Sequence, residues 1–247
     1  MDIHNDQQSS IEDDESRGIS LFPNDQDLVI TSVEMMRKPK HCYLIRFGQY
    51  SMSVHEDIMI KYRLMKGAVF QKEELEEIVV ADERQQAYVE ALRFLERKPR
   101  TEKEIAQRLG QKGMTADGIE KTIERLQQER LVDDELYAKQ WAEQRITKQK
   151  KGRMWVRQEL RQKGIDSELI VEALNEVNEE DEFYSAYLIG KKKWQQIKGD
   201  ALERKRKTGA FLMRRGFTGE QVRKVINKLI TEDKEAENSL EELEVFE

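Results

Sequence analysis

One seven-residue frame occurs three times in this chain, and its spacing constrains the fold more than any other feature. The frame reads Leu-x-x-(Lys/Arg)-Gly-apolar-(Thr/Asp), and its copies occupy residues 109–115, 160–166 and 212–218. Its glycines, at positions 113, 164 and 216, are 51 and 52 residues apart. Self-similarity at a long, nearly constant period is typical of repeat proteins, in which each unit is one small supersecondary module.

Each copy of the frame predicts the end of one helix and the start of the next. A glycine just after a helix favours the left-handed conformation that terminates it. The residues expected to cap the following helix, by accepting hydrogen bonds from its free N–H groups, are Thr115, Asp166 and Thr218. Capping boxes are expected where Thr101 precedes Glu104 and where Thr218 precedes Gln221.

Apolar residues flank every copy at matching offsets. Downstream they form an i, i+4, i+7 stripe, which predicts one buried helix face: Ile119, Ile123 and Leu126; Ile170, Leu174 and Val177; Val222, Ile226 and Leu229. Upstream, a tyrosine lies four residues before another apolar residue, which predicts the buried face of a first helix: Tyr88 and Leu92, Tyr137 and Trp141, Tyr184 and Leu188. The chain is therefore predicted to be mainly α, with three tandem three-helix repeats of roughly 50 residues.

Short β-branched and aromatic runs precede the repeats, at residues 28–36, 41–47 and 50–54. They predict a small antiparallel β element, followed by a short helix near residues 56–64 and a longer one from about Gln71. The expected organisation is a disordered acidic tail (1–27), the β-rich element (28–80), repeats 1 to 3 (81–132, 133–180 and 181–230) and an acidic C-terminal tail (231–247).

Charge is strongly segregated along the chain. The 247 residues are 37% charged, with a net charge of -6, yet the region after Trp141 is basic while both ends are acidic. We predict a basic face that binds a partner or nucleic acid, made of Arg145, Lys148, Lys150, Lys151, Arg153, Arg157, Arg161, Lys163, Lys191, Lys192, Arg204, Lys205, Arg206, Arg214 and Arg215. Solvated helix faces explain any single cluster equally well, but four clusters together favour a phosphate-bearing or acidic partner.

Sequence-specific reading of duplex DNA is not expected. The third helix of repeat 2, predicted near residues 167–182, carries no basic residue and would be repelled by phosphates. Helical spacing favours core positions for Trp141 and Trp194. Trp155 fits either packing or stacking on single-stranded bases.

The sequence offers no convincing catalytic or metal-binding set, so we expect neither enzymatic activity nor a cofactor. Asp133 and Asp134 precede a helix, where N-capping explains them better than metal binding. Three scattered histidines and the single Cys42 provide no zinc ligands and no internal disulfide. Without a signal-like N-terminus or a long apolar run, a cytoplasmic location without membrane segments is expected.

The central repeat resembles the RecX family of bacterial recombination regulators. The resemblance rests on Leu131-Val132-Asp133-Asp134-x-x-Tyr137-Ala138-x-x-Trp141-x-x-x-Arg145 and on Gly152-x-x-x-Val156-x-x-Glu159-Leu160-x-x-Lys163-Gly164-Ile165. Residues 100–105, with Leu109 and Lys112-Gly113 after them, are similar to the first repeat of that family. Residues 28–77 are similar to the amino-terminal extension of its longer Gram-positive members.

This resemblance implies tandem three-helix repeats that form an elongated, curved body. It also implies a monomeric regulator that binds the RecA recombinase, especially its filament on single-stranded DNA. Such a regulator modulates the recombinase, ATPase and co-protease activities of RecA, and inhibition is the expected sense. The alternatives are a nucleic-acid-binding helical protein without a filament partner and a purely structural scaffold.

The acidic residues after Thr231 suggest two roles. They could fold back on the basic face and weaken non-specific nucleic-acid binding, or they could be a solubilising tail.

Overall fold

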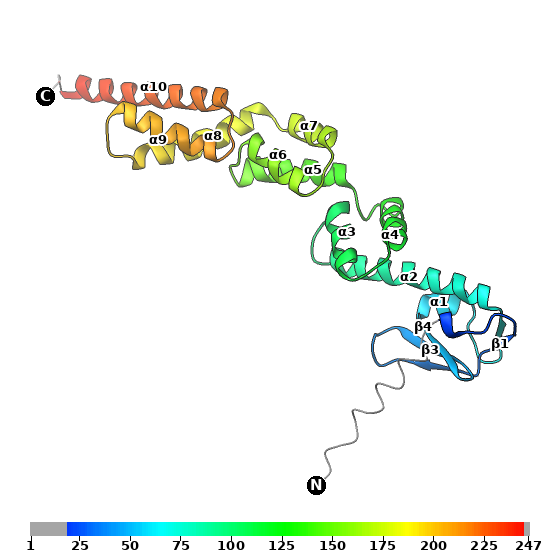
Figure 1. Cartoon of the computed structure of the whole chain (residues 1–247). Helices are drawn as coiled ribbons and strands as arrows, with labels where there is room; N and C mark the ends of the chain where they lie inside the picture. The colour runs from blue at the N-terminus through cyan, green and yellow to red at the C-terminus, as the bar shows by residue number, and fades with distance from the viewer. Residues whose placement is uncertain (1–18, 245–247) are drawn as a thin grey trace, which may run out of the picture. The chain divides into compact units, whose positions relative to one another are not determined.

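A computed structural model describes residues 19–244 of the chain, with side chains up to residue 236, and it forms two compact units (Figure 1). The first unit contains residues up to 98 together with 105–129, and the second contains 99–104 together with the residues from 130 onward. Residues 1–18, which make up most of the acidic N-terminal tail expected from the sequence, lie outside the described part.

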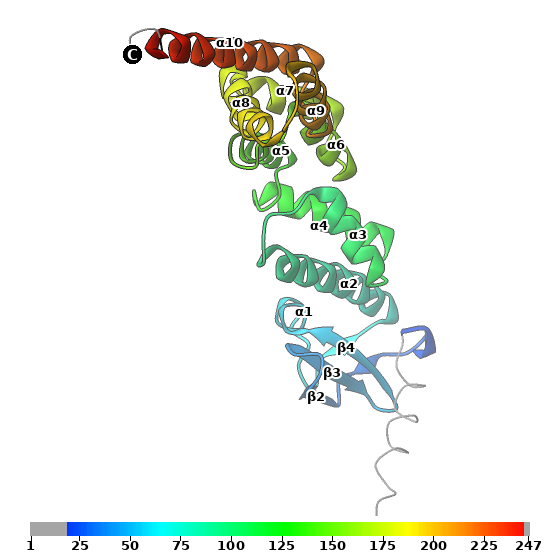
Figure 2. The same cartoon turned by 90° about the vertical axis from the view of Figure 1, so that its left-hand side faces the viewer.

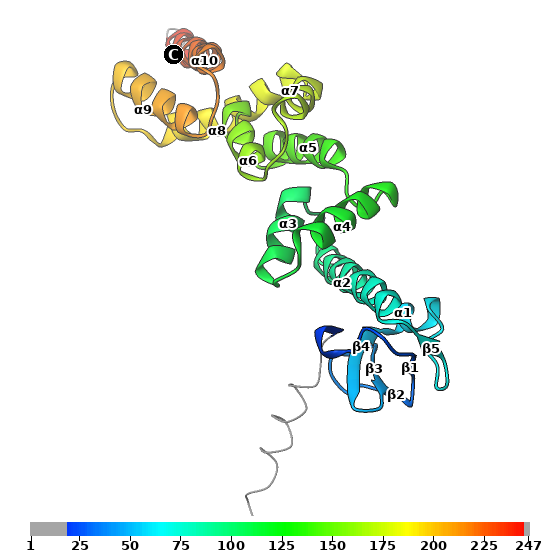
Figure 3. The same cartoon turned by 45° about the vertical axis from the view of Figure 1, so that its right-hand side comes forward.

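The first unit opens with the small antiparallel β element that the sequence predicts (Figure 3). A three-stranded sheet has the order β2-β3-β4, made of β2 (Ser32–Met35), β3 (Cys42–Phe47) and β4 (Tyr50–His55). A second pair joins β1 (Leu28–Val29) to β5 (Val69–Phe70). Both sheets are antiparallel, so short turns suffice to connect most of the strands.

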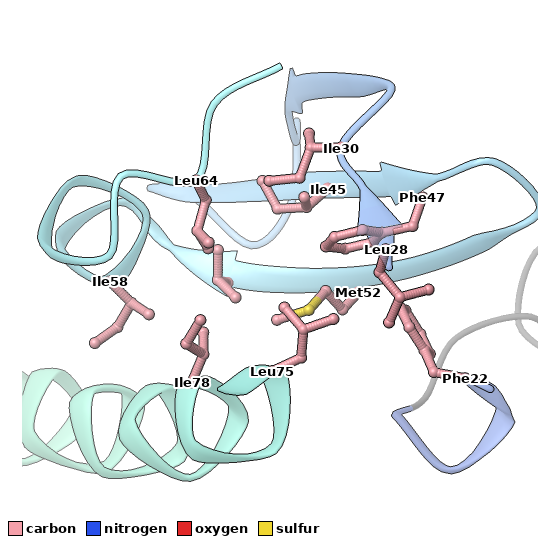
Figure 4. Close-up of a cluster of buried hydrophobic side chains, with 11 residues drawn as sticks. Phe22, Leu28, Ile30, Ile45, Phe47, Met52, Ile58, Leu64, Leu75 and Ile78 are labelled. Carbon is pink, nitrogen blue, oxygen red and sulfur yellow. The ribbon is translucent and has the colours of Figure 1, made fainter. Parts of the chain in front are cut away.

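Two helices, α1 (Glu56–Lys61) and α2 (Lys72–Leu95), pack against the sheet. Figure 4 shows Leu75 and Ile78 of α2 directed towards the sheet, where Met52 lies in the same apolar cluster. Phe22, which follows the 3-10 turn η1 (Ile19–Leu21), is buried in that cluster. Residue 22 lies inside the segment expected to be disordered, so the ordered domain begins before Leu28.

The helix α2 belongs to two structural parts, because its first half covers the sheet and its second half packs against α4 (Ala116–Gln128). Tyr88 and Ala91 of α2 are buried in the first three-helix module, as are Ile105 and Leu109 of α3 (Glu102–Gln111). The domain boundary expected at residue 80 therefore falls within one continuous helix.

The second unit contains the other two modules. One consists of α5 (Asp134–Glu143), the π-helical turn η2 (Gln144–Lys148), α6 (Arg153–Gln162) and α7 (Ser167–Glu176). The other consists of α8 (Glu179–Gln196), α9 (Ala201–Arg214) and α10 (Gly219–Glu244), and Figure 2 shows α10 lying across α8 and α9. Each module has its own buried apolar cluster, and the two include Ile170 and Leu174 in one and Val222 and Ile226 in the other.

The helix ends predicted from the repeated frame are confirmed. Gly113, Gly164 and Gly216 have positive φ angles of 78°, 85° and 88°. In every copy the glycine N–H donates to the carbonyl three residues earlier, and the next N–H donates to the carbonyl five residues earlier, at 2.9–3.3 Å. This double bond pattern is the Schellman motif, which satisfies carbonyls that a helix end leaves free.

The predicted N-caps are also confirmed, because the side chains of Thr115, Asp166 and Thr218 each accept a hydrogen bond from a main-chain N–H of the following helix. The capping box of Thr101 and Glu104 is complete, with both reciprocal bonds at 3.2 Å. The box at Thr218 is only half formed. There the Gln221 side-chain oxygen is buried without a hydrogen-bond partner in the described part of the chain.

The predicted buried face of the first helix is wrong in repeat 3. Tyr184 and Leu188 are exposed, whereas Phe183 and Tyr187 pack against the apolar cluster. Apolar residues occupy adjacent positions of α8, about 100° apart around the helix. Local spacing therefore could not decide which pair is buried, and packing against α9 and α10 selected the other pair.

Candidate nucleic-acid and partner interface

Main-chain hydrogen bonds join the last two modules inside the second unit. The N–H of Gly152 donates to the carbonyl of Arg215 at 2.9 Å, and the N–H of Met154 donates to that of Gly216 at 3.0 Å. The approach is so close that a Cβ atom at Gly152 would lie 2.2 Å from the Gly216 main chain. We call this contact the Gly152–Gly216 junction.

A buried carboxylate also stabilises this junction. Glu182, near the start of α8, has a fully buried side chain. Its Oε1 accepts the main-chain N–H of Arg153 at 2.9 Å, and its Oε2 accepts the Arg153 Nε–H at 2.6 Å. A buried charge needs such partners to offset its lost hydration. Arg153, predicted as part of the binding face, thus has a structural role.

Several cations and one exposed ring gather around the junction. Lys151 Nζ lies 3.7 Å from the centroid of the Trp155 ring, and Trp155 is 40% exposed. Burial, together with the positive charges of Arg215 and Arg145, lowers the pKa of Lys151. Main-chain hydrogen bonds bring these residues together, because the Lys151 N–H donates to the Arg145 carbonyl at 3.0 Å and the Gly152 N–H donates to the Arg215 carbonyl at 2.9 Å. Arg214, the neighbour of Arg215 in the sequence, is exposed.

Glu159 of α6 organises the aromatic part of this surface. Its two carboxylate oxygens accept the indole N–H groups of Trp141 at 3.0 Å and of Trp155 at 2.9 Å. The same carboxylate is 2.8 Å from Nε of Arg145, whose guanidinium lies 4.0 Å from the centroid of the Trp141 ring. Trp141 packs against the core of its module, as predicted, while Trp155 stays at the surface with its ring held in place.

Other predicted cations are engaged inside the fold. Lys163 Nζ is 2.9 Å from Glu104, and hydrogen bonds to Tyr137 and Glu104 raise its pKa although burial opposes this. Lys150 donates to the Thr147 carbonyl and, at 3.4 Å, to the Ser185 hydroxyl. Glu104 therefore partly compensates the charge of Lys163, whereas Lys150 donates to neutral oxygens of η2 and α8.

Two acidic residues of α10 compensate further cations. Glu232 lies 3.0 Å from Lys191 and accepts the Tyr187 hydroxyl, while Asp233 lies 3.0 Å from Arg204 and accepts the Trp194 indole N–H at 2.7 Å. Both acids belong to the segment expected as an acidic tail, but α10 continues through it to residue 244. The first residues of this segment thus neutralise basic side chains as part of a continuous helix, and the predicted effect on nucleic-acid binding stays a prediction.

The remaining predicted cations make no ion pair within residues 19–236. They are Lys148, Lys151, Arg157, Arg161, Lys192, Lys205, Arg206, Arg214 and Arg215. Lys205 and Arg206 lie about ten residues before Arg215, which at 1.5 Å per residue is roughly 15 Å along α9. The fifteen predicted residues therefore do not form one uniform patch, and the uncompensated charge closest to an exposed aromatic ring lies at the Gly152–Gly216 junction.

The sequence prediction missed the carboxylates that divide the cations into paired and unpaired groups. Glu159, Glu182, Glu232 and Asp233 lie between 14 and 41 residues from their cationic partners. No i, i+4 spacing could reveal such pairs. Met154 and Met213, exposed near the junction glycines, were also missed.

Asp133 and Asp134 act at the start of α5. Asp133 caps the helix by accepting the Leu136 N–H at 2.8 Å, which confirms the predicted cap. Asp134 accepts the Glu102 N–H at 3.1 Å, and burial, together with the neighbouring carboxylates of Glu102 and Asp133, raises its pKa to about 6. No cluster of three or more His, Cys, Asp or Glu suited to a metal ion is found among the described residues, and none of their helices could cross a bilayer.

Comparison with known proteins agrees with this arrangement. The sequence matches the first, second and third three-helix domains of RecX, over residues 87–126, 133–174 and 179–226. The regulatory protein RecX of Clostridium acetobutylicum is 30% identical over 214 residues, which cover 84% of this chain and 99% of that protein. RecX of Oceanobacillus iheyensis is 33% identical over 190 residues, which cover 76% and 70%.

Solved structures of RecX proteins share this fold. A crystal structure of a regulatory protein RecX superposes with a TM-score of 0.67 at 26% identity, covering 81% of this chain and 99% of that one. RecX from Lactobacillus salivarius shares the fold, with a TM-score of 0.59 at 23% identity, covering 61% and 99%. Together with the three repeats and their helix ends, these matches show that the chain belongs to the RecX family of regulatory proteins.

Proposed function

We propose that this protein binds the RecA recombinase on single-stranded DNA and inhibits its recombinase, ATPase and co-protease activities. The observation that carries the proposal is the Gly152–Gly216 junction, where Lys151 lies over the ring of the exposed Trp155 and the main chain of Arg215 accepts a hydrogen bond from that of Gly152. The role is regulatory and non-catalytic. A monomeric state and a cytoplasmic location remain predictions.

The chemistry of the junction suits a nucleoprotein partner. Lysine and arginine attract phosphates without reading sequence, and an exposed aromatic ring can stack on an unpaired base of any kind. Trp155 is already oriented by its bond to Glu159, so little rotamer entropy is lost on binding. A protein held at such a surface hinders filament growth or excludes competing partners.

Charge reversal tests this directly. The double variant Lys151→Glu/Arg214→Glu is compared with Arg97→Glu/Lys98→Glu, which changes the net charge equally in the first unit, where both cations are exposed. Binding to assembled RecA–DNA filaments and the RecA ATPase on single-stranded DNA are measured with each variant. The junction variant should bind more weakly, and its salt dependence should decrease by roughly 1.4, because each single-strand phosphate contact contributes about 0.7 to that slope.

Unchanged affinity together with unchanged salt dependence in the junction variant would reject the anchoring role. If the junction variant bound more weakly but the wild-type protein left the ATPase unaffected at saturation, binding would stand and inhibition would be refuted.

A second candidate is a helical protein that binds nucleic acid without a filament, and the exposed Trp155 among cations favours it equally. Binding to naked and to RecA-coated single strands at one salt concentration separates the two. Strong preference for coated DNA supports the RecA regulator, and equal binding supports the alternative.

A further inference from the structure

The β element at the N-terminus lies outside the three matched family domains, which begin at residue 87. It contains an apolar slot of about 420 Å³ between the sheet and the loop that follows α1. Val33 of β2 and Tyr43 of β3 line one side, and Ile60 and Met65 line the other. This slot is distinct from the Gly152–Gly216 junction, because all of its lining residues belong to the first unit.

The apolar character of the slot comes from the core face of the sheet, which continues to the edge strand. Val33 pairs with the buried Ile45, and Met35 pairs with Tyr43, so these side chains share one face. At the edge of the sheet the apolar side chains become exposed to solvent: Met35, Ile60 and Met65 are 68%, 67% and 63% exposed. Exposed apolar side chains grouped in this way mark an interaction surface rather than scattered surface residues.

The main chain of β2 is open on the same side. β2 is the last strand in the order β2-β3-β4. The Met36 N–H donates to Cys42 of β3 at 2.9 Å, so the alternating pattern of an antiparallel pair directs the N–H and C=O groups of Met35 and Val33 away from β3. Within residues 19–244 no other strand pairs with that edge. An open edge beside an apolar slot can accept an added strand.

Uncompensated positive charge lines the slot and occupies the turn next to it. Arg63 and Lys66 line it, and the turn after Met36, next to the Met35–Tyr43 pair, carries three more cations: Arg37, Lys38 and Lys40. None of these five side chains makes an ion pair within the described part of the chain. Glu34, the acid of β2, alternates to the opposite face, where it accepts the Ser32 hydroxyl.

The loop wall of the slot is fixed before any ligand arrives. The N–H of Leu64 donates to the Met59 carbonyl at 3.0 Å, and the N–H of Gly67 donates to the Ile30 carbonyl at 2.8 Å. Leu64 is fully buried beneath the loop. A preformed wall lowers the entropy lost on binding.

We infer that this slot binds an extended acidic segment of a partner protein, which adds a strand to the free edge of β2. Apolar side chains at alternate positions of the segment would enter the slot, and its carboxylates would meet the five surrounding cations. The inference goes beyond the proposed function and does not depend on the identity of the partner.

The test uses the full chain and a fluorescein-labelled ten-residue peptide that alternates glutamate with valine or leucine. A second peptide, with lysine in place of every glutamate, is the control. We expect the acidic peptide to bind at least about tenfold more tightly than the basic one, a difference of about 1.4 kcal/mol. Amide hydrogen exchange at Val33 and Met35 should slow when the acidic peptide is present, because both N–H groups become paired.

Two variants probe the side chains and the main chain separately. Ile60→Glu/Met65→Glu changes exposed side chains and should weaken binding about tenfold or more. Met35→Pro removes an outward N–H, which an edge strand tolerates, and should weaken binding with the slot intact. Leu202→Glu, at an exposed apolar residue of α9, is the matched control and should bind normally.

Equal binding of the two peptides, or unchanged exchange at Val33 and Met35, would overturn the inference. If removal of residues 1–18 raised peptide affinity about tenfold, the acidic N-terminal segment of this chain would replace an external partner as the occupant. A dimer that Ile60→Glu dissociates would instead assign the slot to a second copy.

Discussion

Replacing Glu182 with alanine leaves the main-chain N–H and the guanidinium of Arg153 without their carboxylate. The two bonds, at 2.9 and 2.6 Å, join the start of α6 to α8 at the Gly152–Gly216 junction. The junction fixes the main chain beside Lys151 and at Arg215, so the variant tests both the fold and the proposed interface.

The magnitude follows from the two bonds. Each hydrogen bond to a charged group contributes about 1.5–3 kcal/mol, which gives about 3–6 kcal/mol for both. The Arg153 side chain is 21% exposed and can turn towards water, so the loss of its bond should cost an energy at the lower end of that range. We expect Glu182→Ala to reduce the free energy of unfolding by about 3–4 kcal/mol. Glu182→Gln keeps an acceptor for the main-chain N–H and should lose about 1.5–2 kcal/mol.

Urea unfolding followed by tryptophan fluorescence measures this loss in the second unit, because Trp141, Trp155 and Trp194 all lie there. Glu220→Gln, an exposed acid of α10 paired with Lys224, is the control and should show no measurable change. A loss below about 1 kcal/mol for Glu182→Ala, or equal losses for the alanine and glutamine variants, would refute the role assigned to the buried charge.

Three further changes are expected to have measurable effects. Asp134→Asn should raise stability at pH 7.5 by about 1 kcal/mol, after discounting for solvent screening of a half-buried group. Because the folded-state pKa of Asp134 is raised to about 6 from 3.8, wild-type stability falls as pH rises through this window, and pH-dependent thermal melts should lose that slope in the variant. Gly216→Ala places a Cβ within 2.5 Å of Trp155, whereas Gly113 has a similar φ and open space around it. In urea unfolding, Gly216→Ala should therefore lower the free energy of unfolding by about 2 kcal/mol more than Gly113→Ala. Equal losses would contradict the close approach. Glu232→Gln/Asp233→Asn should raise the affinity for bare single-stranded DNA and steepen the salt dependence of that binding, because Lys191 and Arg204 lose their acidic partners. Fluorescence anisotropy measures both. Unchanged binding would favour a purely structural or solubilising role for these acids.

The helix ends could be predicted from the sequence because they depend on neighbouring residues. The glycine adopts the left-handed conformation that ends one helix, and a Thr or Asp shortly after it caps the next helix. Because both effects act within five residues, the frame specified all three turns. The complete box at Thr101 shows the same local logic, whereas the half-formed box at Thr218 shows its limit. There the side-chain oxygen of Gln221 is buried and accepts no hydrogen bond from the main-chain N–H of Thr218.

The composition of the proposed binding surface could be predicted only in part. Counting basic residues after Trp141 showed in which half of the chain the cations concentrate, since charge is a property of the sequence. Whether a cation is available to a partner depends on the carboxylates that packing brings beside it. Arg153 and Lys163 form ion pairs with Glu182 and Glu104, respectively, which lie 29 and 59 residues away in the sequence.

The sequence by itself determined the repeated helical modules, the β element before them and the family to which they belong, because periodicity and turn chemistry are local. Only the tertiary structure decided which face of α8 is buried, which cations remain unpaired, and that Gly152 meets Gly216. These choices depend on the docking of helices that are distant in sequence, where burial and ion pairing compete among several faces of similar hydrophobicity.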